Sequence, residues 1–245
     1  MSGHSHFKTV MHKKGAEDQK RGKIFSKLSR MISVAAKEGT DSELNPKLRQ
    51  ALNEAKSLNM PKENIERAIK RGTGELGEEK LEEVSYEGFG PAGTAIIIEG
   101  ITDNKNRTLS EIKQILRKYG GKLAEAGSVK WLFERKGVIT INQKSKIKNQ
   151  KDKEDLELKV IEAGAEDIYW HETENILDVY TKAEELEKVK KNLEIQGFEI
   201  ESTSLDWVSR EQIEVPTEER KKCEKFFEEL SENEAIQDIY SNLKV

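Results

Sequence analysis

The chain has little cysteine, proline or aromatic residue, and it lacks long apolar runs. Of its 245 residues one is a cysteine, Cys223, four are prolines, and 6% are aromatic. A single cysteine excludes an intrachain disulfide and fits a reducing compartment. No apolar run approaches the ~20 residues that a membrane-spanning helix needs, and the first residues carry no apolar signal core. We therefore expect a globular, cytoplasmic protein.

Signatures of common catalytic sites are also missing. The sequence contains no phosphate-binding loop of the Walker type, no His-Glu-x-x-His pair and no nucleophile elbow. His4, His6 and His12 lie together, but a tetrahedral zinc site needs a fourth ligand, and Cys223 is remote in sequence. The sequence therefore predicts no enzyme activity, no metal site and no cofactor.

Charge is divided unevenly along the chain. Residues 1–71 contain 16 Lys+Arg and 8 Asp+Glu, a net charge of +8, whereas the remaining 174 residues contain 26 and 38, a net charge of −12. Asymmetry of this kind points to polyanion binding by one part of a protein, although most charge runs are solvated helix faces. Because the basic residues coincide with a compact helical segment, we expect residues 1–71 to bind nucleic acid.

Periodicity predicts a first helix around residues 20–35, preceded by a polar, basic arm over residues 2–16. Apolar residues of this helix fall on one side and a row of cations falls on the other, at spacings of three, four and three. Like charges so close repel one another, so we expect the row to face solvent and bind phosphate. Simple disorder of the arm in the free protein fits the same composition. The expected nucleic-acid contacts are His4, Ser5, His6, Lys8, His12, Lys13, Lys14, Lys20, Arg21, Lys23, Lys27 and Arg30.

Two further helices complete the predicted N-terminal domain. Asn45 followed by Pro46 is typical of a helix N-terminus, and an apolar stripe continues from there to Leu58. Pro61 begins a third helix, which ends near Gly74 after Lys and Arg residues that suit the negative end of a helix dipole. A linker follows over residues 72–80.

The remainder of the chain has the pattern of α/β structure. A buried strand over residues 93–101, a helix opened by a Thr108–Glu111 capping box and a strand over 128–133 predict a parallel β-α-β unit. Residues 137–203 predict a β-α-β-β-α-β ferredoxin-like arrangement. The C-terminal residues add a strand, a helix and a last strand. We expect an α+β protein with three domains, and their residues are 1–80, the discontinuous pair 81–135 with 204–245, and the insert 136–203.

A polar loop joins the first buried strand to the following helix. Its position suits anion binding at a helix N-terminus, with Arg107 on phosphate. A structural Asx-turn, in which Asp103 and Asn104 bond the local backbone, fits the same residues. The candidate functional loop consists of Thr102, Asp103, Asn104, Asn106 and Arg107.

A series of short motifs resembles the YebC/PmpR family along essentially the whole chain. The motifs are Gly3-His4-Ser5, Lys20–Phe25, Asn45-Pro46-x-Leu48-Arg49, Asn59-Met60-Pro61, Tyr86-Glu87-Gly88, Thr102–Thr108, Gly127-Ser128-Val129 and Ile239–Asn242. The resemblance implies a helical N-terminal domain and two α/β domains, and a relationship to the mitochondrial translational activator of cytochrome c oxidase. Family members are described both as DNA-binding transcriptional regulators and as translation factors acting at the ribosome.

No sequence-reading device is recognisable in the basic module. It has no helix-turn-helix glycine at the usual spacing, no zinc finger and no aromatic pair on a basic strand. This favours shape-specific binding of ribosomal or transfer RNA over promoter reading. The prediction is a non-enzymatic regulator of gene expression, with a DNA-binding transcriptional regulator as the alternative. A more remote alternative is a small-ligand sensor or an enzyme that uses a cleft between the α/β domains.

Overall fold

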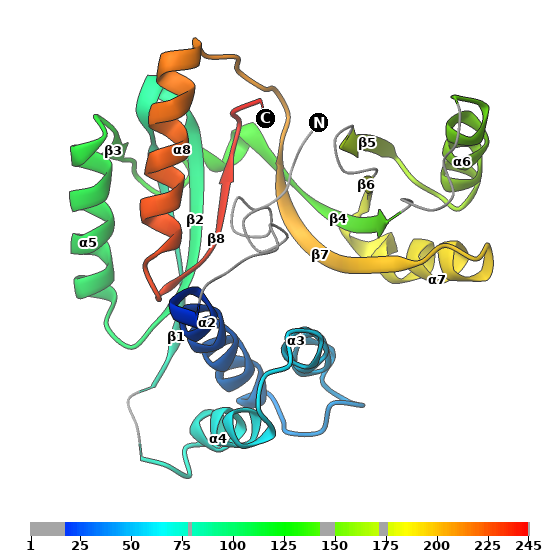
Figure 1. Ribbon diagram of the computed structural model, residues 1–245. Helices are drawn as coiled ribbons and strands as arrows, with labels where there is room; N and C mark the ends of the chain where they lie inside the picture. The colour runs from blue at the N-terminus through cyan, green and yellow to red at the C-terminus, as the bar shows by residue number, and fades with distance from the viewer. Residues whose placement is uncertain (1–17, 78–79, 143–149, 172–175, 245) are drawn as a thin grey trace. The chain divides into compact units, whose positions relative to one another are not determined.

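A computed structural model describes residues 18–77, 80–142, 150–171 and 176–244 (Figure 1). The side chains of residues 18–20 and 150–151 lie outside this description. The described chain divides into two compact units. One unit holds residues 18–129 with 215–239, and the other holds residues 130–214 with 240–244.

The first unit begins with the predicted three helices. Their bounds are α2 (Asp18–Ala36), α3 (Pro46–Ser57) and α4 (Lys62–Thr73). The Asn45 side chain accepts a hydrogen bond from the Leu48 N–H, as expected of an N-cap. Gly74 closes α4 at a φ of 83°, a conformation that favours glycine. Residues from the apolar stripes form one core, and its buried members are Leu28, Ile32, Ala35, Ala36, Leu48, Ala51, Ala55, Met60 and Ala68.

Helices α2 and α4 cross closely because small residues line the crossing. A Cβ atom on Gly72 would lie 2.2 Å from the carbonyl oxygen of Ser33. The Ser33 hydroxyl donates a hydrogen bond of 2.8 Å to the carbonyl oxygen of Ala68. The crossing therefore requires glycine at residue 72.

The first unit also contains a four-stranded sheet in the order β3-β1-β2-β8. Its elements are β1 (Glu82–Phe89), β2 (Ala95–Thr102), α5 (Lys105–Lys118), β3 (Lys122–Leu123), α8 (Thr217–Ser231) and β8 (Ile236–Ser241). The predicted pairing of the C-terminal strand with this part of the chain is confirmed, since β8 lies beside β2.

Three details of this sheet correct the sequence prediction. The predicted parallel β-α-β unit is wrong, because its first strand is β2 of this sheet, whereas its second strand belongs to a different sheet. Residues 128–132 form a turn and a 3₁₀ turn, whereas the predicted strand begins only at Phe133. The helix begins at Lys105, where the Asn104 side chain accepts from the Arg107 N–H. The predicted Thr108–Glu111 capping box is therefore wrong, since Thr108 is buried in the first turns and its hydroxyl contacts that of Thr102.

The second unit is the predicted ferredoxin-like insertion, with a sheet in the order β5-β6-β4-β7. Its elements are β4 (Phe133–Asn142), α6 (Gln150–Glu162), β5 (Asp167–His171), β6 (Ile176–Lys182), α7 (Leu186–Ile195) and β7 (Ile200–Ser209). The last strand predicted within residues 137–203 and the first strand predicted in the C-terminal residues are one strand, β7. The α+β class, with N-terminal helices followed by two four-stranded sheets, is confirmed. The division into three domains stays a prediction, and its boundaries at 135/136 and 203/204 fall inside β4 and β7.

Candidate nucleic-acid interface

The predicted contacts of the N-terminal arm lie outside the described residues. His4, Ser5, His6, Lys8, His12, Lys13 and Lys14 all precede Asp18, and the side chain of Lys20 is also outside the description. Three members of the predicted row can be placed, Lys23, Lys27 and Arg30, together with the predicted contact Arg21.

The four cations of α2 do not share one environment. Arg21 is exposed, and its guanidinium carbon lies 6.0 Å from the centre of the Phe25 ring. Lys23 is half-buried. Lys27 is 2% exposed, and the Arg30 side chain is 15% exposed. The expectation that the row faces solvent is therefore wrong for Lys27 and Arg30.

Lys27 is held at the C-terminal end of α8. Its ammonium group donates a hydrogen bond of 2.8 Å to the carbonyl oxygen of Ser231, the last residue of that helix. Carbonyl groups at a helix C-terminus lack partners within the helix and carry partial negative charge, which attracts a cation. Burial lowers the pKa of Lys27 from 10.5 to about 7, and the charge of Lys23 adds to this, while the nearby carboxylates of Asp238 and Glu234 oppose it.

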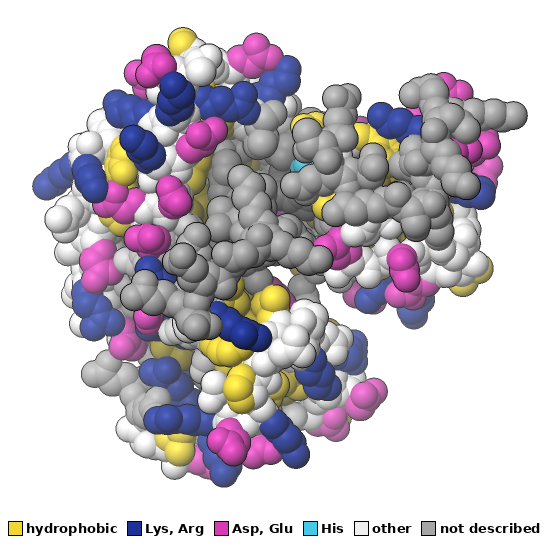
Figure 2. Space-filling model, in the orientation of Figure 1, with side chains coloured by type: hydrophobic (Ala, Val, Ile, Leu, Met, Phe, Trp, Pro, Cys, Tyr) yellow, Lys and Arg dark blue, Asp and Glu magenta, His cyan; other side chains and the backbone are white. Residues whose placement is uncertain are grey.

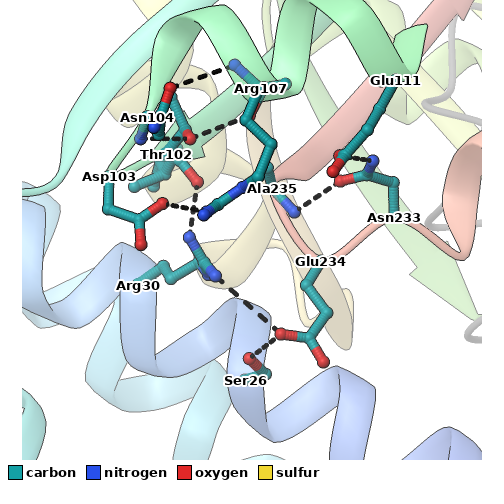
Figure 3. Close-up of polar contacts among 12 residues, drawn as sticks. Ser26, Arg30, Thr102, Asp103, Asn104, Arg107, Glu111, Asn233, Glu234 and Ala235 are labelled. Atoms are coloured by element: carbon teal, nitrogen blue, oxygen red, sulfur yellow. Dashed lines mark hydrogen bonds and ion pairs between the residues drawn. The ribbon is translucent and has the colours of Figure 1, made fainter.

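Arg30 connects α2 to the sheet of the same unit (Figure 3). Its guanidinium donates a 3.2 Å hydrogen bond to the carbonyl oxygen of Ile101 and lies 3.8 Å from the Glu234 carboxylate. The Ser26 hydroxyl donates to the same carboxylate at 3.1 Å. Lys27 therefore attaches the helical bundle to α8 and Arg30 attaches it to β2, and in this arrangement both charges face groups of the same chain.

Several side chains of the predicted functional loop bond one another or the loop backbone (Figure 3). Asn104 accepts from the Arg107 N–H at 3.0 Å, and its own N–H donates to the Thr102 hydroxyl at 2.9 Å. The Arg107 guanidinium donates to the Asp103 carboxylate at 2.5 Å, with the arginine side chain 54% exposed. Asn106 is exposed on the first turn of α5. These contacts are those of the structural interpretation for Asn104, while anion binding by Arg107 stays a prediction.

Exposed cations that the sequence prediction did not single out lie on the other two helices of the bundle. In Figure 2 Lys and Arg side chains stand on the visible face of the molecule among acidic ones. Two are in surface ion pairs, Lys47 with Glu38 at 2.8 Å and Lys62 with Glu66 at 3.5 Å. Surface pairs of this kind exchange readily for another anion because they are weak. The exposed cations of α3 and α4 are Lys47, Arg49, Lys56, Lys62, Arg67 and Lys70.

A glycine-rich run that the sequence prediction did not single out follows the body of α4. Residues 72–77 read Gly-x-Gly-x-x-Gly. A dinucleotide-binding fingerprint follows a strand and opens a helix, whereas this run ends α4, and the next described element is β1. It therefore terminates a helix and does not have the setting of a dinucleotide site.

Comparison with protein families identifies both parts of the chain. The model for the TACO1/YebC protein N-terminal domain matches residues 5–75, and that for the TACO1/YebC second and third domain matches residues 81–243. The chain belongs to the TACO1/YebC family. The predicted resemblance is therefore confirmed.

Close relatives of this TACO1/YebC chain carry regulatory names. A "Probable transcriptional regulatory protein" of Persephonella marina is 47% identical over 247 residues, covering 100% of this chain and 96% of the relative. One of the same name in Thermotoga petrophila is 46% identical over 246 residues, covering 100% and 94%. The crystal structure of a conserved hypothetical protein from Aquifex aeolicus matches with a TM-score of 0.84 at 43% identity, covering 96% of this chain and 95% of that one.

Two further findings concern the described residues alone. None of the helices there is long and apolar enough to cross a membrane. Across the same residues no group of three or more His, Cys, Asp or Glu side chains is placed to hold a metal ion.

Proposed function

We propose that this TACO1/YebC protein is a non-enzymatic regulator of gene expression that binds nucleic acid through its basic helical domain. The observation that carries the proposal is the net charge of +8 in residues 1–71 against −12 in the rest. Phosphate contacts dominate nucleic-acid affinity, and acidic domains keep such contacts at the basic end.

The burial of two α2 cations changes which side chains we assign to phosphate. The proposed contacts on the described residues are the exposed Arg21, the half-buried Lys23 and the exposed cations of α3 and α4. The arm residues and Lys20 remain proposed contacts from the sequence. Lysine and arginine on helix surfaces suit the backbone of structured RNA, which proteins recognise mostly by shape. For this reason we favour a ribosome-associated translation factor.

A DNA-binding transcriptional regulator is the second candidate. It is supported by the name "probable transcriptional regulatory protein" that the relatives carry. The two candidates share the basic domain and differ in the nucleic acid that it meets. A ligand sensor or an enzyme stays a more remote alternative.

Co-sedimentation of the full-length protein with ribosomes from its own cells, over a series of salt concentrations, tests the proposal. We expect log affinity to fall linearly with log salt, because cations on phosphate release counter-ions. The triple variant K56E/R67E/K70E should weaken association and flatten the slope, since each phosphate contact contributes about 0.9 or less to it.

A matched control carries the same change in charge on the other unit. The exposed Lys159, Lys188 and Lys191 lie on α6 and α7, and their replacement by glutamate should leave association unchanged. Binding of duplex promoter DNA in place of ribosomes, at about 10⁻⁸ M or tighter, would support the transcriptional candidate. Binding of neither nucleic acid would overturn the proposal.

A further inference from the structure

A cluster of aromatic, basic and apolar side chains lies at one end of the paired strands β4 and β7. We call it the Trp131 patch, and its members are Lys130, Trp131, Arg135, Leu205 and Trp207. All five belong to the second unit. The Trp131 side chain lies in the 3₁₀ turn that precedes β4.

Strand register brings the patch together. Arg135 of β4 is the direct cross-strand neighbour of Trp207 of β7. The Arg135 guanidinium carbon lies 5.1 Å from the centre of the Trp207 ring, and the Lys130 ammonium group lies 4.6 Å from it. Cations at these distances from an indole are attracted by the electron density of the ring face. Two positive charges are thus held beside the Trp207 indole, and one of them belongs to Lys130, the chain neighbour of Trp131.

The helical layer of this unit ends before it reaches the patch. A Cβ atom on Gly137 would lie 2.9 Å from the Leu186 side chain, so α7 begins directly over that residue. Arg135 lies on the same face of β4 as Gly137, two residues away from it. Trp207 likewise lies on the same face of β7 as Leu205, two residues away. Figure 1 shows both strands continuing past α7. Among the described residues, no helix covers the side chains on this length of strand.

Large apolar side chains are exposed in the patch. Trp131 is 68% exposed and Leu205 is 42% exposed. The turn that carries Trp131 is anchored, because the Arg210 N–H donates a 2.9 Å hydrogen bond to the carbonyl oxygen of Leu132. Exposed apolar side chains grouped together mark interaction sites more often than scattered single ones do.

The charge around the patch opposes that of its unit. Residues 130–214 contain 14 Lys+Arg and 20 Asp+Glu, a net charge of −6. Lys130 and Arg135 belong to the patch, and Arg210 is exposed beside its anchoring bond. Glu134 points to the opposite face of β4, and Glu211 is exposed beyond the end of β7. A local positive charge next to aromatic rings complements a ligand that is both flat and anionic.

We propose that the Trp131 patch binds single-stranded nucleic acid, with an unpaired base stacked on the Trp131 indole and the adjoining phosphates on Lys130 and Arg135. Every base has a face that stacks on an aromatic ring, so such a site accepts many sequences. Duplex bases are already stacked on one another, which makes unpaired segments the fitting class. The inference rests on the proposed function in taking nucleic acid as the ligand, and adds a second contact outside the basic helical domain.

Fluorescence anisotropy with the full chain tests the stacking contact. The probe is a labelled oligouridine of about ten nucleotides, within the usual site size, and the comparison probe is an abasic strand of equal length and charge. Trp131→Ala should weaken oligouridine binding about tenfold, as the loss of one base–aromatic stack predicts. Trp131→Phe should retain most of the affinity. Neither variant should alter the weaker binding of the abasic strand.

Controls separate this inference from the proposed function. Ile195→Ala removes an apolar side chain that is 84% exposed on α7 of the same unit, and it should bind both probes like the wild type. Equal binding of oligouridine by the wild type and Trp131→Ala would overturn the patch while leaving the helical domain's role intact. Ribosome association lost in Trp131→Ala with normal oligouridine affinity would assign the patch to a protein partner and overturn it too. Failure of K56E/R67E/K70E to weaken ribosome association would count against the proposed function alone.

Discussion

Helix α2 and helices α3 and α4 present similar patterns of lysine and arginine with different outcomes. On α2, Lys27 is 2% exposed and its ammonium group bonds the end of α8. On α3 and α4, Lys56 and Lys70 are exposed. Periodicity identifies the polar side of a helix, but it does not say whether water or another part of the chain meets that side. A row of cations is evidence for nucleic-acid binding only where no acidic element of the same chain covers it.

The strongest test of this difference is charge reversal at a buried lysine of α2 and at an exposed lysine of α3. Lys27→Glu would place a carboxylate against the Ser231 carbonyl oxygen, near Asp238 and Glu234. Breaking a buried charged contact in this way costs about 3–5 kcal/mol of unfolding free energy. Lys56→Glu, on the exposed side, should change it by less than about 0.5 kcal/mol. Urea denaturation of both variants checks the difference, and equal stability would contradict the burial of Lys27.

The same contacts decide which variant tests phosphate binding. Replacing Lys23, Lys27 and Arg30 together by glutamate looks from the sequence like a clean test of phosphate binding with little effect on thermal unfolding. Because Lys27 attaches the bundle to α8 and Arg30 attaches it to β2, we expect that variant to unfold at a lower temperature. Loss of binding in it would report folding as much as phosphate contact, so K56E/R67E/K70E is the better variant.

A second effect concerns pH. The pKa of Lys27 is about 7 in the folded protein and 10.5 ordinarily, so between these values the unfolded chain binds more protons. The contribution of Lys27 to the unfolding free energy therefore rises with pH across this window, by at most about 1.4 kcal/mol per pH unit. The cost of burying the charge is fully present below pH 7 and is relieved above it.

The Lys27→Met variant isolates this dependence. It keeps an unbranched side chain of similar length and cannot titrate. The unfolding free energy of the wild type minus that of the variant should increase from pH 7 to pH 10. A difference that stays flat over this range would show that Lys27 keeps its ordinary pKa.

The smallest expected effect concerns the ion pair between Arg30 and Glu234, which lies close to the Lys27 contact. Arg30 and Glu234 are 3.8 Å apart, and the Glu234 side chain is 54% exposed. A double-mutant cycle with Arg30→Ala and Glu234→Ala should give a coupling of about 0.2–1 kcal/mol, as for other partly exposed pairs. It should shrink in high salt, which screens exposed charges. A coupling larger than the roughly 3–5 kcal/mol expected from breaking the Lys27 contact would contradict the view that the buried contact is the stronger of the two.

Local signals in the sequence predicted much of the fold. Asn45 and Pro46 mark the start of α3, and Gly74 marks the end of α4, because each conformation favours a particular residue type. The alternation of elements after residue 133 predicted the ferredoxin-like sheet. Strand β1 was missed, since its sequence EEVSYEGF has no apolar run and several of its residues are exposed.

The candidate site was less predictable because it depends on contacts between distant segments. Lys27 and Ser231 are 204 residues apart in the chain, and no pattern within α2 reveals the helix end that it meets. The Trp131 patch has the same origin. Trp207 reaches Arg135 and Lys130 only through the pairing of β4 with β7, and the sequence read locally places the three in separate elements.

The position of β8 has a consequence for synthesis on the ribosome. The three helices and the sheet of the second unit are each encoded without interruption, so each is complete soon after its last residue leaves the exit tunnel. The first sheet needs β8, whose residues Ile236–Ser241 come at the very end of the chain. Its inner strand β2 therefore lacks its partner on one edge until the residues of β8 have been synthesised. A nascent chain stopped before residue 236 therefore holds an open sheet edge, and premature termination there yields a product prone to aggregate.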